Sequence, residues 1–399
     1  MKSVLFYCDA AEFGGHEAMT LKIVRHLCRQ RGLHVAFAYY EKNVRLRESL
    51  QAINDVSGNL RLWPLRSCAK TLQALRTLIS FKQVGRAKAL IRNVNPDVVV
   101  ISQGRIESGS LGLLAAKKAG YRTISYLPVA HEVSVAGKAV AVRVRAAINA
   151  YYYRLPDRII TISEGSRAMM RERGASGDIV TVANAIELQE IQECARHRFR
   201  EAHGLKDVEC AIAIVGRIHF RQKGQDFALR TIARFREQLL GCRFLFVGQG
   251  PDENRLRDAL RVWGLSPQVE IVPWTKNPGE VYAGIDMLLI PSRFEGVPLV
   301  MLEAMSHRIP IAASDTDGMA EILPRDWLFP VGDGKAMIDT LMRIRSSDHS
   351  NLLELHRQRI LEEFTLPRFC AQMTEAILQE REPAETRMDH SAKTLAVGR

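Results

Sequence analysis

The sequence has no apolar run of the roughly 20 residues that a membrane-spanning helix needs. Its first residues also lack an apolar stretch of signal-peptide length, so we expect a cytoplasmic protein. The seven cysteines are widely scattered, and none forms a CxxC pair. This number and spacing argue against a disulfide framework and against a zinc site. We therefore expect reduced and mostly buried thiols.

Acidic residues are missing from two stretches of a chain whose formal net charge is +12. Between Asp55 and Asp97 the only charged residues are cations: Arg61, Arg66, Lys70, Arg76, Lys82, Arg86, Lys88 and Arg92. A basic surface attracts nucleic acid, phospholipid headgroups or phosphorylated substrates, and a solvated helix surface has the same composition.

The second acid-free stretch, residues 133–156, combines cations with aromatic rings. It holds Lys138, Arg143, Arg145 and Arg154 next to Tyr151, Tyr152 and Tyr153. Cations beside aromatic rings suit a lipid–water interface, so this stretch predicts docking on the cytoplasmic face of an anionic membrane. The alternative is an amphipathic core helix with solvated arginines.

Two series of short apolar runs predict the fold. The first comprises Val4–Cys8, Val35–Tyr39, Val98–Ile101, Thr123–Leu127 and Ile159–Ile162, and the second comprises Ala211–Val215, Phe244–Val247, Val269–Val272, Met287–Ile290 and Ile309–Ala313. Amphipathic segments of helical period separate them. Fully apolar strands indicate a parallel sheet covered by helices on both faces. The 399 residues therefore predict an α/β protein with two Rossmann-like, doubly wound domains facing a cleft.

The polar stretch Glu187–Asp207 separates the two series and places the domain boundary near Asn184. We expect an N-terminal domain over residues 1–184 and a C-terminal domain over 185–380. Helical patterns follow Pro330, and the polar, aperiodic residues 381–399 predict a flexible tail.

The segment from Pro291 to Met305 carries the strongest chemical signal. It leaves an apolar strand, crosses a turn and enters a helix, and ligands in open α/β sheets bind at such carboxyl ends of strands. Gly296 allows close approach of the backbone to a ligand, and free amides at the helix start favour a diphosphate or a sugar hydroxyl. Glu295 and Glu303 offer two carboxylates as acceptors for sugar hydroxyls, unless they are a helix cap and a surface charge.

These two glutamates stand with seven residues between them in S-x-F-E-G-x-P-L-x-x-L-E-A-M, which resembles the E-x7-E signature of family 4 glycosyltransferases. The resemblance continues through Val215-Gly-Arg-Ile, Lys223-Gly-Gln-Asp226, Phe246-Val-Gly-Gln-Gly250, Arg308-Ile-Pro-Ile and Asp317-Gly-Met-Ala-Glu-Ile322. It covers the second half almost throughout. The first half matches only at points, among them Gly14-Gly-His-Glu17 and Val182-Ala-Asn-Ala-Ile186.

The resemblance implies a GT-B fold, with the donor held mainly by the second domain and the acceptor mainly by the first. It implies retaining hexosyl transfer from a nucleotide-diphosphate sugar to a glycan or lipid-linked acceptor, in polysaccharide or lipopolysaccharide synthesis. The acceptor oxygen would attack on the face from which the diphosphate departs. No metal and no other cofactor would be needed, because two cations and a helix start neutralise the leaving group.

Site residues follow from matching positions of the family motifs. The implied catalytic residues are Glu295, His131, Lys223 and Arg217. The implied donor-binding residues are Gly15, Arg217, Arg221, Lys223, Trp274, Thr275, Glu295, Gly296, Val297, Pro298, Leu299 and Glu303, and the acceptor-side residues are Gly14, His16 and Glu17. Arg217 and Lys223 stand one residue farther apart than in the commonest family spacing, which makes Arg221 a candidate for either role.

Other functions compete with this interpretation. A UDP-sugar epimerase or a sugar phosphorylase shares the two-domain architecture, although the E-x7-E segment favours a transferase. A dinucleotide oxidoreductase also has Rossmann layers, but no G-x-G-x-x-G follows the first strand. The sequence has no zinc-finger spacing, helix-turn-helix or RNA-binding motif, so we expect no nucleic-acid partner. The sugar, the base and the acceptor depend on pocket shape, which no motif encodes.

Overall fold

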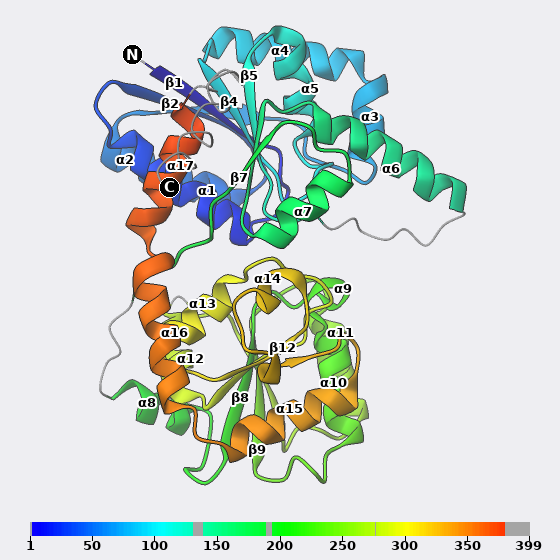
Figure 1. Ribbon diagram of the computed structural model, residues 1–399, viewed down its shortest axis with the longest axis vertical. Coiled ribbons are helices and arrows are strands. Elements are labelled where there is room, and N and C mark those ends of the chain that lie inside the picture. Colours follow the sequence, from blue (N-terminus) through cyan, green and yellow to red (C-terminus); the bar gives the residue numbers. More distant parts are fainter. Residues whose placement is uncertain (1, 131–138, 189–193, 276, 380–399) are drawn as a thin grey trace, which may run out of the picture.

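The computed structural model describes residues 2–130, 139–188, 194–275 and 277–379. Two α/β units lie one above the other in Figure 1, and each has a parallel sheet between layers of helices. This arrangement confirms the predicted fold of two doubly wound domains. The predicted flexible tail, residues 381–399, lies outside the described residues.

The first sheet has seven parallel strands in the order β3-β2-β1-β4-β5-β6-β7. They are β1 (Lys2–Cys8), β2 (Leu33–Tyr40), β3 (Leu60–Leu65), β4 (Val98–Ser102), β5 (Arg122–Tyr126), β6 (Arg158–Thr161) and β7 (Asp178–Thr181). Alternate residues of β1 enter different cores: Phe6 packs in one apolar cluster and Tyr7 in the other, on the opposite face of the sheet. Every residue of β4 is buried, because helices cover both faces.

Seven helices connect these strands. They are α1 (Gly15–Cys28), α2 (Val44–Ser57), α3 (Gln73–Ile79), α4 (Phe81–Val94), α5 (Ser110–Ala119), α6 (Ala139–Arg154) and α7 (Glu164–Glu172). Local signals set several helix ends. The Asn43 side chain accepts a hydrogen bond from the backbone of Leu46 at the start of α2, and Gly58 ends that helix with a φ of 62°.

The second sheet has six parallel strands in the order β10-β9-β8-β11-β12-β13. They are β8 (Cys210–Val215), β9 (Cys242–Val247), β10 (Val269–Val272), β11 (Met287–Ile290), β12 (Ile311–Ser314) and β13 (Leu328–Phe329). The helices are α8 (Ala195–Ala202), α9 (Phe220–Lys223), α10 (Gln225–Arg234), α11 (Glu253–Val262), α12 (Pro278–Gly284), α13 (Leu299–Ser306), α14 (Asp317–Ala320), α15 (Gly334–Ser346) and α16 (Ser350–Glu363), with the short 3-10 helix η1 (Arg325–Trp327).

The strand order reverses between β1 and β4 in the first sheet and between β8 and β11 in the second. The loops that leave such neighbouring strands turn to opposite faces, which opens a crevice at the carboxyl edge of the sheet. The loops after β1 and after β8 meet across the domain junction, since Glu12 and Arg217 form an ion pair there. The two crevices therefore face each other.

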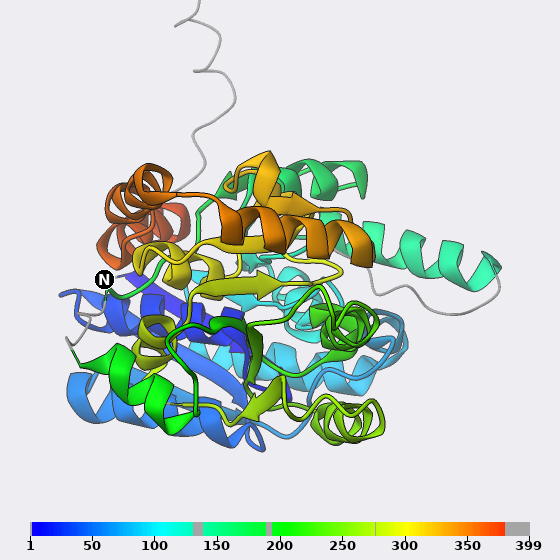
Figure 2. The ribbon, with the colours of Figure 1, turned by 90° about the horizontal axis from the view of Figure 1, so that it is seen from below.

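The last described helix, α17 (Leu366–Leu378), returns to the first domain and packs beside α1 (Figures 1 and 2). Its last carbonyl groups have no partner within the helix. Cations of the first domain donate hydrogen bonds to them: Arg122 to Ile377 O at 2.9 Å, Arg158 to Ala376 O at 2.7 Å and Lys2 to Leu378 O at 3.0 Å. The second half of the chain thus contributes a helix to the first domain.

Helix α6 projects from the first domain in both ribbon views (Figures 1 and 2). The prediction that its three tyrosines lie at a lipid–water interface is wrong for two of them. Tyr152 and Tyr153 are buried, and their hydroxyls donate to Ala74 O at 3.1 Å and Ala130 O at 3.3 Å. They occupy the inner face of the helix, whereas Tyr151 is exposed. Lys138 lies outside the described residues.

Candidate functional site

The loop between β11 and α13 holds the predicted Glu295 at the second switch point. This carboxylate is almost fully buried, and its Oε1 atom accepts hydrogen bonds from Lys223 Nζ at 2.5 Å and from Ser292 Oγ at 3.1 Å. Lys223 ends α9, a single turn that follows β8. The two loops that leave the switch point therefore bring a cation and an anion together.

Close backbone contacts hold these loops in place. A Cβ atom at Gly224, which has a φ of 67°, would lie 2.0 Å from Pro291 O, so the turn after Lys223 rests directly on the end of β11. A Cβ atom at Gly318 would lie 2.2 Å from Gly296 O, which places the start of α14 against the loop of Glu295. Glycine is required at both positions because no side chain fits there.

The loop after β8 presents Arg217 to the first domain. Its guanidinium donates a hydrogen bond to Glu12 Oε2 at 2.6 Å, while its backbone carbonyl accepts one from Gln225 Nε2 at 2.9 Å. The neighbouring His219 is partly buried, and burial together with the charge of Arg217 lowers its pKa. Arg221, the alternative phosphate ligand, has an exposed side chain.

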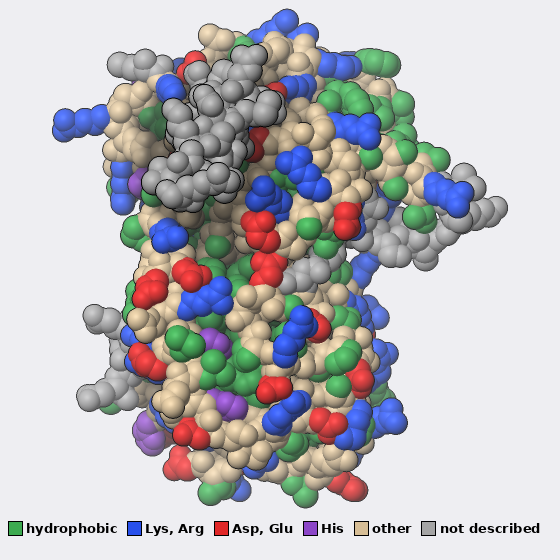
Figure 3. Space-filling view, viewed as in Figure 1, with side chains coloured by type: hydrophobic (Ala, Val, Ile, Leu, Met, Phe, Trp, Pro, Cys, Tyr) green, Lys and Arg blue, Asp and Glu red, His purple; other side chains and the backbone are tan. Residues whose placement is uncertain are grey.

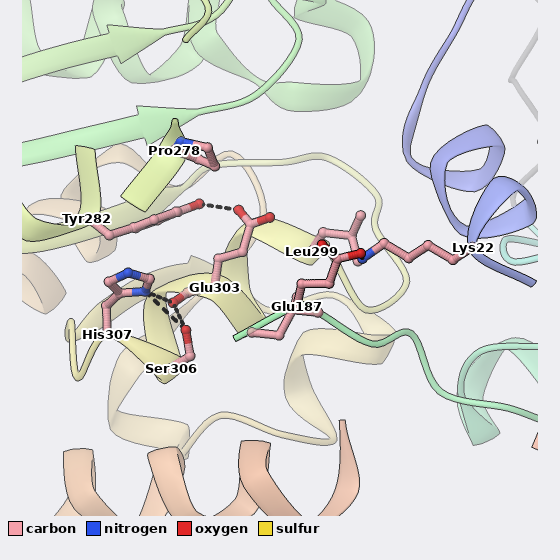
Figure 4. A pocket seen from close by; sticks show the side chains of 9 residues that line it. Lys22, Glu187, Pro278, Tyr282, Leu299, Glu303, Ser306 and His307 are labelled. Carbon is pink, nitrogen blue, oxygen red and sulfur yellow. Dashed lines mark hydrogen bonds and ion pairs between the residues drawn. The ribbon is translucent and has the colours of Figure 1, made fainter. Parts of the chain in front are cut away.

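Glu303 lies on α13 and lines a cavity of about 130 Å³ between the domains (Figure 4). Tyr282 of α12 donates a hydrogen bond from its hydroxyl to Glu303 Oε2 at 2.6 Å. Burial raises the pKa of Glu303, although the Tyr282 hydroxyl and the charge of Lys22 oppose that shift. Lys22 reaches the same cavity from α1, and its Nζ atom lies 3.9 Å from Glu187 Oε1.

The start of α1 is the part of the first domain that faces the loop before α13. Glu17 closes a capping box by accepting a hydrogen bond from the backbone of Gly14 at 2.8 Å. His16 Nδ1 lies 3.0 Å from Glu17 Oε2. Burial opposes ionisation of Glu17, but the charge and hydrogen bond of His16 and the backbone amides outweigh it and lower the pKa of Glu17.

Several contacts join the two domains at this junction. Asn184 donates a buried hydrogen bond to Val297 O at 2.8 Å, so the domain connection holds the loop that precedes α13. A Cβ atom at Gly15 would lie 3.9 Å from Leu299 Cδ1, and one at Gly296 would lie 2.7 Å from Ile162 Cδ1. The predicted donor-site backbone from Gly296 to Leu299 is thereby in contact with the first domain.

The structure brings most of the predicted residues to this junction. Trp274 and Thr275 follow β10, with the Trp274 ring partly exposed and Thr275 Oγ1 accepting a hydrogen bond from the backbone of Asn277. Pro298 caps α13 rather than starting it, because its ψ of 137° is extended. His131 lies outside the described residues, and its role stays a prediction.

Several residues of the junction lie outside the predicted site, and four of them are Glu12, Lys22, Tyr282 and His307. His307 lines the Glu303 cavity, and burial lowers its pKa. None of the four belongs to the motifs that identified the site. The only available signal was the position of Glu12 just before Gly14-Gly15, because the loop after the first strand was already a candidate.

One group of metal-ligating residues occurs among the described residues, formed by Cys8, His16 and Glu17. Their ligand atoms lie within 4.8 Å of one another. Glu17 already accepts the hydrogen bond of the Gly14 amide and contacts His16, and burial strongly raises the pKa of the Cys8 thiol. A buried thiol held in its neutral form is a poor metal ligand, so the chemistry of this group does not favour a metal.

Both halves of the chain match known families. Residues 209–347 match the glycosyl transferases group 1 family, and residues 14–185 match the glycosyl transferase 4-like domain. The amylovoran biosynthesis glycosyltransferase AmsD of Erwinia amylovora is 26% identical over 237 residues, which cover 59% of this chain and 64% of AmsD. The match therefore spans less than two thirds of that relative.

Two solved structures share the arrangement of both domains. HepE of Anabaena, in complex with UDP-glucose, aligns with a TM-score of 0.74 at 14% identity over 94% of this chain and 99% of that chain. The apo form of the lipopolysaccharide outer core galactosyltransferase WaaB aligns with a TM-score of 0.65 at 20% identity over the same shares of the two chains. At these identities the likeness concerns the fold.

Proposed function

Since this chain belongs to the group 1 glycosyltransferases of family 4 and has their GT-B fold, we propose that it transfers a sugar from a nucleoside-diphosphate sugar to a glycan or lipid-linked acceptor. The observation that carries the proposal is the Lys223–Glu295 pair at the second switch point, opposite the start of α1. The UDP-glucose bound to HepE supports a donor of this class. AmsD takes part in amylovoran biosynthesis and WaaB is a lipopolysaccharide outer core galactosyltransferase, which supports a role in polysaccharide or lipopolysaccharide assembly.

Lys223 is central to the proposed chemistry. An ammonium group has three N–H donors, so Lys223 can keep its hydrogen bond to Glu295 and donate another to a donor phosphate. Arg217 and Arg221 add positive charge from the same loop. Together these cations stabilise the negative charge that develops on the leaving nucleoside diphosphate, which is the task that preorganised charges perform in catalysis.

The other site residues are assigned to the sugar, the ribose, the base and the acceptor. Glu295 binds hydroxyls of the donor sugar, Glu303 binds the ribose hydroxyls, and Trp274 and Thr275 lie beside the base. Backbone amides at the start of α13 add donors for the sugar. Gly14, His16 and Glu17 lie on the acceptor side, where the leaving phosphate accepts the proton of the attacking hydroxyl as the sugar is transferred with retention of configuration.

A panel of UDP-, GDP- and ADP-sugars tests this function without an acceptor. We expect one nucleotide class to raise the melting temperature and to be hydrolysed slowly by the full chain. The anomer first released, followed by NMR, should have the configuration of the donor. No shift and no hydrolysis with any donor would contradict the proposed function, and the opposite anomer would contradict retention alone.

We also propose that catalysis needs no metal ion, because Arg217, Lys223 and the start of α13 supply the charge and donors at the diphosphate. Donor hydrolysis by the wild-type chain should be unchanged in saturating EDTA. Activity that returns only on addition of Mg²⁺ or Mn²⁺ would contradict this part of the proposal.

The lipid-linked acceptor class requires the first domain to meet a membrane. Over the described residues, no helix is long and apolar enough to span one. We propose instead that the protein docks from the cytoplasmic side through the α3–α4 surface, defined by Leu75, Ile79, Phe81, Arg76 and Lys82. Ile79 and Phe81 are 70% and 76% exposed, and both cations are exposed beside them. Figure 3 shows apolar side chains gathered over α3, with Lys and Arg around them.

Exposed apolar side chains among cations match the chemistry of an anionic lipid surface. Each Lys or Arg near such a surface contributes about 1 kcal/mol of attraction, and apolar side chains insert between headgroups. These features support a docking surface on α3 and α4 rather than on the tyrosines of α6.

Co-sedimentation with vesicles tests the docking surface. We expect binding to phosphatidylserine-containing vesicles that weakens with salt, and loss of most binding in an Ile79→Ser/Phe81→Ser variant. Val262→Ser on α11 is the matched control, because Val262 is equally exposed but belongs to the second domain. Equal binding to neutral and anionic vesicles, or an equal effect of the control, would contradict the proposed surface.

A further inference from the structure

Two cysteines lie side by side at the amino edge of the second sheet. Cys210 begins β8 and Cys242 begins β9, and the two residues are direct partners in the parallel register of these strands. The backbone of Cys210 also donates a hydrogen bond to Gly241 O at 2.8 Å. The carboxyl ends of these strands lead to the proposed donor site, so the thiols lie at the far edge of the domain.

Arg345 of helix α15 brings its guanidinium against the pair. Arg345 Nη1 lies 3.3 Å from Cys242 Sγ and donates a hydrogen bond to Leu240 O at 3.2 Å. A Cβ atom at Gly241 would lie 3.2 Å from Arg345 Nη2, and the φ of Gly241 is 74°. Glycine therefore leaves the space through which Arg345 reaches the sulfur.

The surroundings shift the pKa values of the two thiols in opposite directions. The Cys210 thiol donates a hydrogen bond to Cys242, which with Arg345 lowers the pKa of Cys242 to about 7 against the opposing effect of burial. The same hydrogen bond, burial and the negative charges of Cys242 and Asp286 raise the pKa of Cys210. Asp286 itself forms an ion pair with Arg200, whose Nη1 atom lies 3.1 Å from Asp286 Oδ2. These opposite shifts favour the thiolate on Cys242 and the neutral thiol on Cys210.

We propose that Cys210 and Cys242 form a peroxide-sensitive dithiol that closes to an intramolecular disulfide, with Cys242 as the attacking sulfur and Cys210 as the resolving one. The inference is independent of the proposed sugar transfer. Neighbouring strands of a sheet lie about 4.8 Å apart, and disulfides join Cα atoms at roughly 4.4–6.8 Å. Cys242 is buried, whereas Cys210 is partly exposed and Arg345 is exposed, so a molecule as small as hydrogen peroxide has a short path to the pair.

The reaction balances in two steps. The Cys242 thiolate attacks one oxygen of hydrogen peroxide, the O–O bond breaks, and the departing hydroxide takes up a proton to become water. This leaves a sulfenic acid on Cys242. The Cys210 sulfur then attacks the Cys242 sulfur, the S–O bond breaks, and the leaving hydroxide takes the Cys210 proton. Two thiols and one peroxide yield one disulfide and two waters.

Peptide mapping of the full chain tests the proposal. The reduced protein is treated with hydrogen peroxide at neutral pH, unfolded in urea with N-ethylmaleimide and digested with trypsin, which releases Cys210 within residues 207–217 and Cys242 within 237–243. We expect these two peptides to become cross-linked before the exposed Cys194 is oxidised. Full alkylation of both cysteines while Cys194 is oxidised would overturn the proposal.

Two variants separate the roles. In Cys210→Ser, dimedone should trap a sulfenic acid on Cys242, because the resolving sulfur is absent. Arg345→Gln should slow the cross-link roughly threefold or more, since less thiolate is present at neutral pH. Arg343→Gln, on the same helix, is the control and should leave the rate unchanged. Dimedone trapping on Cys210 in a Cys242→Ser variant, or equal rates for both arginine variants, would overturn the assignment.

Discussion

The Lys223–Glu295 pair is predicted to be strongly coupled in stability as well as in function. The Glu295 side chain is 7% exposed and that of Lys223 is 20% exposed. Lys223→Met keeps the length of the side chain but leaves a buried carboxylate with the Ser292 hydroxyl as its remaining partner. Breaking a buried ion pair in this way costs about 3–5 kcal/mol, and we expect the lower end because one fifth of the lysine reaches water.

Glu295→Gln should cost less, about 1.5–3 kcal/mol, because the amide oxygen still accepts a hydrogen bond from Lys223 but the charge is lost. The double variant no longer contains an unpaired charge. Its destabilisation should therefore fall short of the sum of the single values by about 1.5–3 kcal/mol.

Urea unfolding of the four proteins at neutral pH measures this coupling free energy. The exposed pair of Lys335 and Asp339 on α15 is the matched control, and Lys335→Met with Asp339→Asn should couple by about 0.3–0.5 kcal/mol. A coupling at Lys223 and Glu295 no larger than that of the control pair would refute the reasoning from burial.

Three further changes have defined outcomes. Because burial makes Glu303 favour its protonated form, native stability should fall as pH rises from 4.5 through the raised native pKa of Glu303. Glu303→Gln should therefore be more stable than wild type at pH 7, and the difference should be smaller at pH 4.5. An equal difference at both pH values in urea unfolding would contradict this. Burial lowers the pKa of His356 to about 4, so wild type should lose stability between pH 6.5 and 4, and His356→Gln should lose less over that range in the same assay. Gly318→Ala places a Cβ 2.2 Å from Gly296 O and should reduce donor hydrolysis at least about tenfold. The control Gly85→Ala adds a Cβ that meets no atom within 4 Å and should leave the hydrolysis rate unchanged. Equal rates in the two variants would contradict the close packing at Gly318.

Sequence periodicity predicted the central strands and missed three at the edges. The residues of β4 and β11 are fully buried, so they read as apolar runs. The missed strands β3, β7 and β13 are edge strands. Strand β3 carries Arg61 and Pro64 because one side of it faces solvent, and β13 has only two residues. Such strands lack the continuous apolar pattern on which the prediction relied.

The site, like the fold, could be predicted only in part. Motif spacing predicted Lys223 and Glu295, and the fold brings them into contact because their loops leave neighbouring strands at the switch point. The partners of Glu303 were not predictable, since Tyr282 lies on another helix and Lys22 lies in the other domain. The crossing of α17 to α1 was equally invisible, because an amphipathic pattern shows that a helix is packed but not against which domain.

The most direct test of the account is the rate at which the nucleotide sugar selected by the donor panel is hydrolysed by three proteins: wild type, Lys223→Ala and Lys335→Ala. Lys223 is proposed to contact the leaving diphosphate, and removal of a charge-assisted contact worth about 1.5–3 kcal/mol lowers turnover at least about tenfold. Lys335 also pairs with a carboxylate but is exposed on α15. We expect a tenfold or greater loss in Lys223→Ala and a wild-type rate in Lys335→Ala. A wild-type rate in both, with the variants folded, would contradict it.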